Sequence, residues 1–571
     1  MAFLVSPGVE IKEIDATNVV PAVSTSIGGF AGAFNWGPVE EVVTVGSENE
    51  LVEKFGSPDS NTAKYFLTAA SFLKYGNALK VVRVNQGAAA SSPVGDNATA
   101  DGSGQLIKNK SHYEDNYANG SLSKGSWVAK YPGVLGNSLK VSVIASNISS
   151  FSGWAYSGQF EGAPGTSDYA TDLGKTNIKD ELHIAVIDED GAISGTPNQV
   201  LETFAYVSMG SDAKKSDGTS NYYKDVINNN SDYIWWADHP TALTDAGETI
   251  ASQTANSAMT GSTSAIDSSL GGGTDGNVPV VGDLQGGYDL LEDAETVDVN
   301  LLFSVPDANG ANTLANDLIS IANARKDCMA FVSPPIEDTV GSSSPASDVK
   351  TFADSLTSSS YAACDSSAIY VYDKYNDVYR YIGAAGHQAG LCANADRVAD
   401  AWFSPAGVNR GQLLGITKLA FNPKQAERDT LYKARVNPLV SFPGQGTMLF
   451  GDKTLLSRPS AFDRINVRRL FIVLEKAIAT AAKAQLFEFN DEFTRAQFRN
   501  MVEPFLRDVK GRRGLTDFLV ICDETNNTGQ VIDTNRFVAD IFVKPARSIN
   551  FITLNFIATR TGVEFSEISG A

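Results

Sequence analysis

Cysteine and histidine are scarce in this chain, and their spacing excludes several kinds of site. The four cysteines lie far apart and form no CxxC pair, which argues against a zinc site and against a disulfide framework. We expect them to be buried, reduced thiols. The four histidines are also isolated, with no HxxxH or HExxH spacing, so ordinary core or surface roles are favoured over metal binding. The cysteines are Cys328, Cys364, Cys392 and Cys522, and the histidines are His112, His183, His239 and His387.

Long hydrophobic runs are absent as well. No apolar stretch reaches the roughly 20 residues that a membrane-spanning helix needs. The first residues lack the basic region of a signal peptide, and their apolar stretch is too short for one. We therefore expect a protein that is made and kept in a cytoplasm and that does not insert into a membrane.

Catalytic and nucleotide-binding motifs are missing too. The segment Phe442–Thr454 has glycines near a Lys-Thr pair, but Asp452 stands where a P-loop has glycine, and its charge would repel phosphate. We expect a turn between two strands there. No GxSxG occurs, and the tract 271–273, three glycines in a row, is expected to be a linker. These absences predict no cofactor and no enzyme activity.

Acidic residues outnumber basic ones, and their distribution is uneven. The net charge is −21, which makes nucleic acid an unfavourable partner. In residues 381–571, however, 24 basic and 19 acidic residues give a net charge of +5, which leaves −26 for residues 1–380. The two portions are expected to face different surroundings.

The chain of 571 residues is too long for one ordinary core. Helix and strand patterns alternate in residues 23–86 and again in 288–380, which predicts one discontinuous α/β domain. Residues 87–287 are rich in small polar residues and short strand patterns, and we expect a β-rich, acidic, outward-facing insertion. Residues 381–548 form a predicted C-terminal α+β domain, between terminal arms at 1–22 and 549–571.

Two amphipathic helices are predicted in the C-terminal domain. The first, from Asn466 to Gln485, has Asn466 as its N-cap and an apolar face at i, i+3, i+4 spacing. Arg469, Lys476 and Lys483 follow one another at intervals of seven and form a cationic stripe, which by charge pattern alone is most often a solvated face. The second helix runs from about Thr494 to Lys510, and its Pro504 predicts a kink or a break.

Three strand patterns end the chain, at 517–523, 536–544 and 549–558. The third has apolar side chains on both faces although it lies near the end of the sequence, and an uncovered strand of this kind would aggregate. A short strand pattern at 8–12 has no partner nearby in the sequence. We expect a sheet that is shared between chains.

A series of short motifs runs along the chain. It begins with Gly37-Pro38, Phe55-Gly56 and the strand 81–84, and includes the segment 131–141. From Gly383 onward, an alanine- and glycine-rich helix pattern is followed by the motifs Ser404-Pro-Ala-Gly407, Asn437-Pro438, Phe442-Pro-Gly-Gln-Gly446, Gly451-Asp-Lys-Thr454 and Asn466-Val-Arg-Arg469. Together these motifs resemble contractile-tail sheath proteins of the T4-type bacteriophages, and the resemblance is most specific from Gly383 onward.

The resemblance implies a structural subunit of a virion, assembled in the host cytoplasm, that polymerises helically around a tail tube and contracts. Its implied partners are neighbouring sheath subunits, the tail tube protein, and baseplate and tail terminator proteins. With the strand patterns, it predicts that arms are exchanged between subunits through Val9, Ile11, Ile549, Phe551, Leu554 and Phe556. The acceptor sheet would contain Phe518, Val520, Phe537 and Ile541, and the residues facing the tube would be Arg469, Lys476 and Lys483.

Two other classes of function stay open at this point. A capsid or surface-adhesin subunit could use the β-rich insertion to bind a receptor, and a hydrolase with an unrecognised site comes third.

Overall fold

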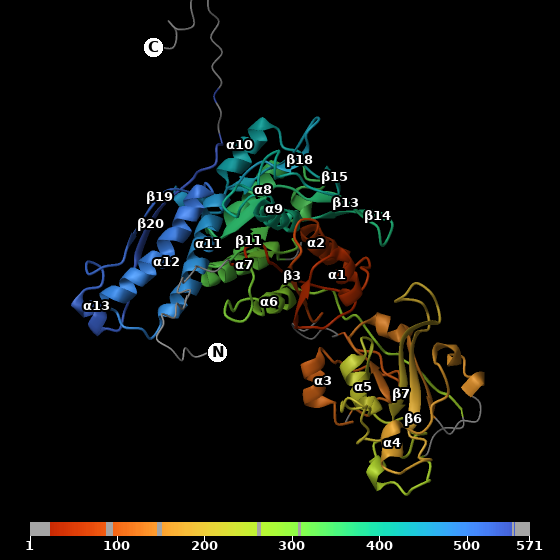
Figure 1. Cartoon of the computed structure of the whole chain (residues 1–571). Helices are drawn as coiled ribbons and strands as arrows, with labels where there is room; N and C mark the ends of the chain where they lie inside the picture. Colours follow the sequence, from red (N-terminus) through yellow and green to blue (C-terminus); the bar gives the residue numbers. More distant parts are fainter. Residues whose placement is uncertain are drawn as a thin grey trace, which may run out of the picture. The chain divides into compact units, whose positions relative to one another are not determined.

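The computed structural model describes residues 23–86, 95–120, 122–145, 151–259, 264–306, 310–550 and 553 (Figure 1). These residues belong to two compact units. The larger unit comprises Ala22–Ala401 and Pro405–Ala477, and the smaller one includes Trp402–Ser404 and the chain from Ile478 onward. Among the described residues, no helix is both long enough and apolar enough to cross a membrane.

A seven-stranded sheet organises the larger unit. The strand order is β16-β12-β11-β10-β1-β3-β2, with all neighbours parallel except β2 and β3. The interior strand β1 pairs with β10 on one side and β3 on the other, so the distant segments around Gly28 and Leu301 share one sheet. The strands are β1 (Gly28–Gly32), β2 (Val42–Val45), β3 (Leu79–Arg83), β10 (Leu301–Phe303), β11 (Met329–Val332), β12 (Ala362–Asp365) and β16 (Val436–Asn437).

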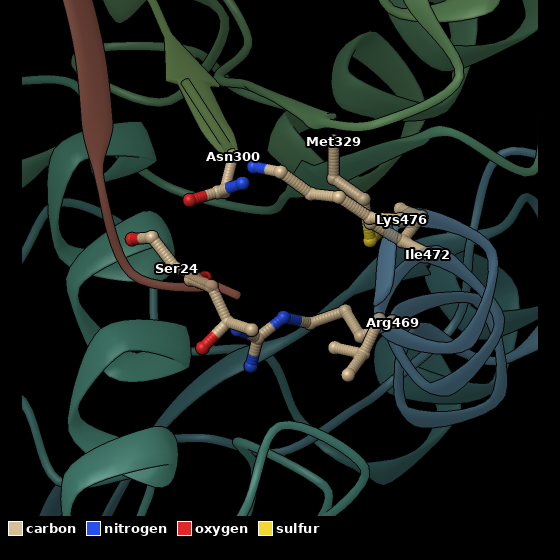
Figure 2. A pocket seen from close by; sticks show the side chains of 8 residues that line it. Ser24, Asn300, Met329, Arg469, Ile472 and Lys476 are labelled. Atoms are coloured by element: carbon tan, nitrogen blue, oxygen red, sulfur yellow. The ribbon is translucent and has the colours of Figure 1, made fainter. Parts of the chain in front are cut away.

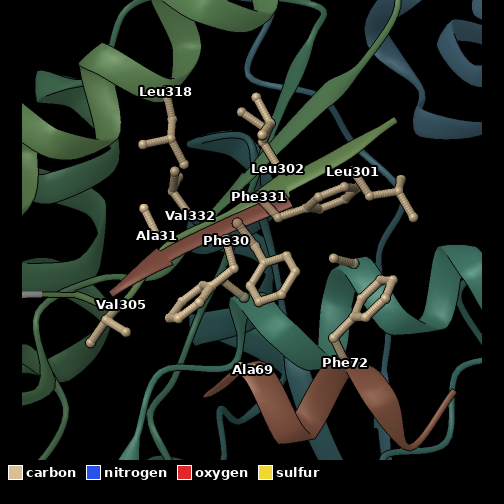
Figure 3. Packing of buried hydrophobic residues seen from close by; sticks show 14 of the residues in the cluster. Phe30, Ala31, Ala69, Phe72, Leu301, Leu302, Val305, Leu318, Phe331 and Val332 are labelled. Carbon is tan, nitrogen blue, oxygen red and sulfur yellow. The ribbon is translucent and has the colours of Figure 1, made fainter. Parts of the chain in front are cut away.

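Helices pack on this sheet, and their ends follow local sequence signals. Helix α1 begins after Ser47, whose hydroxyl accepts a hydrogen bond from the Glu50 amide, and it ends at Gly56, which has a positive φ of 76°. Figure 3 shows Leu318 of α7 on one side of β1 and Phe72 of α2 on the other. The helices of this layer are α1 (Glu48–Phe55), α2 (Ala63–Leu73), α6 (Val281–Asp289), α7 (Ala311–Arg325), α8 (Pro345–Ser355) and α9 (Ala385–Val398).

Aromatic rings join the two halves of the core. The Phe303 ring stacks on Phe30 and on Phe72, with centroid distances of 5.2 and 5.3 Å, and all three side chains are buried. A Cβ atom at Gly28 would come within 2.8 Å of the Phe72 ring, so glycine lets helix α2 approach the sheet this closely.

The boundary expected near residue 381 does not separate two cores. Helix α9 lies beyond it but is buried between the sheet and α2, and β16 extends the same sheet by pairing with β12. The compact units instead divide after Ala477, within α11. The alanines and glycines of α9 explain this, because their small side chains allow a helix to pack closely between other elements.

The inserted region has its own antiparallel sheet of order β7-β6-β5-β9, with a separate pair β4-β8. The three glycines at 271–273 are not a linker, contrary to expectation. Gly271 exchanges backbone hydrogen bonds with Thr99, and a Cβ at Gly272 would lie 2.5 Å from the Gly104 amide nitrogen. The elements are β4 (Trp127–Ala129), β5 (Leu139–Ala145), β6 (Glu181–Asp188), β7 (Gln199–Ser208), β8 (Ile234–Trp236) and β9 (Ile266–Ser269), with α3 (Lys110–Asn116), α4 (Asp168–Asp172) and α5 (Tyr223–Asn230).

Two small sheets complete the larger unit. Strands β14-β13-β15 form one, and β17 and β18 form an antiparallel pair that overlaps the turn and strand pair predicted at 442–454 but begins three residues earlier. The bounds are β13 (Ile369–Asp373), β14 (Val378–Ile382), β15 (Ile416–Leu419), α10 (Gln425–Lys433), β17 (Leu439–Phe442) and β18 (Gly446–Leu449).

The C-terminal elements are α11 (Ile465–Ala482), α12 (Glu492–Gly511), β19 (Leu515–Ile521), α13 (Gly529–Asp533) and β20 (Asp540–Pro545). Helix α11 begins one residue before Asn466, which is therefore not its N-cap. Helix α12 continues past Pro504 without a break, capped at its start by Asp491, whose carboxylate accepts from the Thr494 amide at 2.8 Å.

Candidate functional site

Strands β19 and β20 form an antiparallel two-stranded sheet beside helix α12 (Figure 1). Val520 lies opposite Ile541, and Phe518 lies opposite Val543. These four side chains are buried or half-buried, and β19 contacts α12. One face of the sheet therefore packs on the helix, as the alternation of the sequence requires.

The opposite face of this sheet is apolar and exposed. Leu519 and Phe542 are paired across the strands, and 56% and 57% of their surfaces are accessible. An ion pair lies beside them, where the Lys510 ammonium donates to Asp517 at 3.1 Å; this hydrogen bond lowers the pKa of the Asp517 carboxyl.

Both edges of the sheet lack a strand partner within the described part of the chain, because β19 pairs only with β20. A two-stranded antiparallel pair is marginally stable by itself and presents backbone donors and acceptors along each edge. The arrangement can accept one further strand on either side.

The second predicted strand is shorter than the sequence suggested. It begins at Asp540, so Phe537 is not part of the sheet and the expectation for this residue was wrong. The Phe537 ring instead packs edge-on against Phe498 of α12, with centroids 5.5 Å apart. The Asn527 side chain donates to the Val538 carbonyl and accepts from the Val538 amide, which holds this segment away from strand pairing.

The residues predicted to be exchanged are mostly outside the described residues. Val9, Ile11, Phe551, Leu554 and Phe556 lie there. Ile549 is described, and 80% of its surface is exposed.

Arg469 on α11 is not part of an exposed stripe. Its side chain is only 4% exposed, and its guanidinium donates to the Asp396 carboxylate at 2.7 Å, the Cys392 carbonyl at 3.1 Å and the Thr25 carbonyl at 3.1 Å. The regular spacing placed Arg469 on one line with Lys476 and Lys483, but α9 and the segment around Thr25 cover this part of the helix.

The other two residues of the predicted stripe differ from each other. Lys476 forms an ion pair with Asp298, and its side chain is 20% exposed. Lys483, which follows the end of α11, is exposed. Of the three residues expected to face a tube, Lys483 is the most accessible.

An exposed apolar surface near α12 was not foreseen. Four apolar side chains are exposed there: Leu486 (61%), Phe487 (fully exposed), Phe489 (84%) and Phe493 (76%). Phe487 also has a positive φ of 72°, a conformation that disfavours bulky residues. In the sequence, Phe487, Phe489 and Phe493 lie between the two predicted amphipathic helices, and neither helix pattern needs them for its apolar face.

No metal-binding group of histidine, cysteine or carboxylate side chains is found within the described ranges. The four cysteines are free and buried, as predicted, and burial raises the pKa of Cys328 and Cys392 to about 12. These thiols are packing residues rather than nucleophiles.

Three family models match the chain in succession. They describe the tail sheath protein Gp18 domain III N-terminal region at residues 25–84, the phage tail sheath protein central domain at 285–455, and the phage tail sheath C-terminal domain at 457–559. The unmatched interval is close to the predicted insertion.

Curated relatives match over nearly the whole length. A tail sheath protein of Enterobacteria phage T4 is 34% identical, covering 99% of this chain and 99% of the relative. A tail sheath protein of Vibrio phage KVP40 is 33% identical, covering 99% of this chain and 100% of the relative.

Solved structures share the fold at lower identity. The sheath tail protein Lin1278 of Listeria innocua has a TM-score of 0.52 at 12% identity, covering 92% of this chain and 96% of that one. The helical sheath of the anti-feeding prophage in its contracted state has a TM-score of 0.51 at 13% identity, covering 98% and 100%. With the identity to the curated relatives above 30% along the whole length, the chain belongs to the phage tail sheath protein family and is a structural component of a contractile tail, not an enzyme.

Proposed function

We propose that copies of this sheath protein assemble by exchanging terminal strands, which complete the β19–β20 sheet of their neighbours. The observation that carries the proposal is the open sheet itself, with two edges that no described strand occupies. Added strands form backbone hydrogen bonds along such an edge and need little side-chain specificity.

The apolar outer face supports the same proposal. Leu519 and Phe542 are exposed in the isolated subunit, although they stand in the middle of paired strands. The strand pattern at 549–558 carries isoleucine, leucine and phenylalanine on both faces. A strand of this composition beside the sheet extends an apolar surface that an assembly can bury.

Exchanged strands also suit a sheath that polymerises around a tail tube and contracts. Subunits that rotate as rigid bodies remain connected when each link is a strand in the neighbour's sheet and a flexible arm absorbs the rotation. The strand at 8–12 is assigned to one neighbour and the strand at 549–558 to another. The sheath then acts in the virion, is assembled in the host cytoplasm, and ends at baseplate and terminator proteins.

A truncation tests the exchange. A chain that stops after Ser548 loses the C-terminal strand and keeps β19 and β20. We expect a folded, soluble subunit that forms no tubes by negative-stain electron microscopy and sediments as a monomer. A chain that lacks only residues 562–571 is the matched control and should polymerise. If the chain truncated after Ser548 still forms tubes, exchange of the strand at 549–558 between subunits is contradicted.

We further propose that Lys483 contacts an acidic tube surface. It is exposed and lies in the portion of the chain whose net charge is positive. Exposed charge pairs are screened by salt, so Lys483→Glu should weaken the binding of subunits to purified tubes most at low ionic strength. Lys110→Glu, in the insertion, serves as the control; equal binding of both variants at low salt contradicts this contact.

A further inference from the structure

Three residues join the start of the described chain to the α/β core. The Thr25 hydroxyl donates to the Asp396 carboxylate of α9 at 2.7 Å. The Arg469 guanidinium of α11 donates to the same carboxylate oxygen at 2.7 Å and to the Thr25 carbonyl at 3.1 Å. Thr25 is thus bonded to both members of an ion pair, and the three residues close a ring of hydrogen bonds.

This ring is buried. The side chains of Arg469 and Asp396 are 4% and 11% exposed, and a second guanidinium nitrogen donates to the Cys392 carbonyl. Figure 2 shows Arg469 reaching toward the segment that holds Ser24, beside a small pocket lined also by Asn300, Met329 and Lys476. Charge-assisted hydrogen bonds away from water are stronger and more directional than exposed ones.

The next residues are attached separately. The Ile27 carbonyl accepts from the amides of Asn300 and Leu301 at 2.9 and 3.0 Å, and β1 begins at Gly28 as an interior strand of the sheet. Within the described residues, the ring at Thr25 therefore lies nearer to the N-terminus than the attachment of Ile27 and the first strand of the sheet.

We propose that Thr25, Asp396 and Arg469 form a clamp that carries mechanical load from the N-terminal arm. Tension that a neighbouring subunit applies through the arm passes into helices α9 and α11 and does not peel β1 from the sheet. The inference rests on the proposed strand exchange for its role in the sheath, but the clamp itself is a property of one subunit.

Residue chemistry explains why these three positions suit the task. Arginine binds the carboxylate and two backbone carbonyls at once through its fixed array of donors, which a lysine cannot reproduce. Threonine supplies one donor through its hydroxyl and one acceptor through its backbone carbonyl. Valine at position 25 keeps the shape and the carbonyl but removes the donor.

Single-molecule pulling on the full chain tests the clamp. One handle is placed at the N-terminus and the other at Lys350→Cys on α8, since the described native cysteines are buried. In the unaltered subunit, the N-terminal segment should resist until the clamp opens, and each freed residue then adds about 3.5 Å of length. In Thr25→Val, this first release should move to lower force.

A matched substitution and a second variant keep the test decisive. Thr351→Val removes a hydroxyl that bonds only within its own helix α8, and it should leave the first release unchanged. Arg469→Lys should also lower the release force, with the midpoint of thermal unfolding measured separately to show that the subunit is folded. Release forces for Thr25→Val equal to those of the unaltered protein would overturn the clamp.

The contraction of assembled sheaths distinguishes the clamp from strand exchange. If the clamp holds load, Thr25→Val subunits should form sheaths of normal length that break into shorter pieces on contraction. Sheaths of Thr25→Val that contract intact would contradict the clamp while leaving the exchange standing. If the chain truncated after Ser548 still forms tubes, strand exchange is contradicted, whereas the pulling result, which concerns a single subunit, remains valid.

Discussion

The Tyr75 hydroxyl lies 2.9 Å from Nδ1 of His387 and joins the end of α2 to α9. The Leu414 amide donates to the same hydroxyl at 2.7 Å. Burial lowers the pKa of His387, so its imidazole is neutral at pH 7. This pair fixes two buried helices through one uncharged hydrogen bond.

Acid should weaken the larger unit through His387. Burial, assisted by the nearby Lys74 charge, lowers the pKa of this imidazole to about 3, well below its unfolded value of about 6.5. Its contribution is fully present above pH 6.5 and is lost as the pH falls toward 3, by about 1.4 kcal/mol per pH unit. Denaturant titrations of His387→Gln at several pH values should show a smaller loss of stability on acidification. A variant with the same loss as the unaltered subunit would contradict this assignment.

The pH dependence of stability that arises from Asp365 should have the opposite sign. Its carboxyl is fully buried at the end of β12, and burial raises its pKa to about 7, although hydrogen bonds from Ser333 and the Ser367 amide lower it in part. The folded state binds a proton between about pH 4 and 7 that the unfolded state releases, so stability from this group falls as the pH rises through that window.

The Asp365→Asn variant isolates this effect. Relative to the unaltered subunit, the free energy of unfolding of the variant should be about 2–3 kcal/mol lower at pH 5 than at pH 7.5, so the variant is comparatively less stable at pH 5, because asparagine has no proton to gain. Denaturant titration at the two pH values measures the difference. A difference that does not change with pH would show that Asp365 does not titrate in this range.

Local signals in the sequence predicted the elements better than their partners. The Ser47 cap and Gly56 delimit α1, and both act within one helical turn. The pairing of β16 with β12 was not predictable, since a two-residue strand depends on a distant neighbour. Arg469 was misplaced for the same reason: its spacing along α11 was read correctly, but the carboxylate that buries it comes from α9.

The exposed phenylalanines should matter for assembly and not for folding. Phe487 is fully accessible and has a left-handed backbone, which asparagine tolerates better than phenylalanine. Phe487→Asn should therefore leave the stability of the subunit unchanged or raise it by a few tenths of a kcal/mol, and should raise the protein concentration at which tubes form.

A control for this surface is Val278→Ser, which removes an apolar side chain that is 54% exposed in the inserted region. Light scattering during polymerisation, with thermal unfolding of each subunit, compares the two variants. If Phe487→Asn polymerises at the same concentration as the unaltered subunit, this surface does not contribute to the contacts between subunits.

The central claim is that each β19–β20 sheet is completed by strands from other subunits. Electron cryo-microscopy of assembled sheaths, at a resolution that traces the main chain, tests it most directly. The account predicts that both open edges are occupied, one by residues 8–12 of one neighbour and the other by residues 549–558 of a second neighbour. Flanking strands that trace back to the same chain, or edges that stay unoccupied in the sheath, would contradict it.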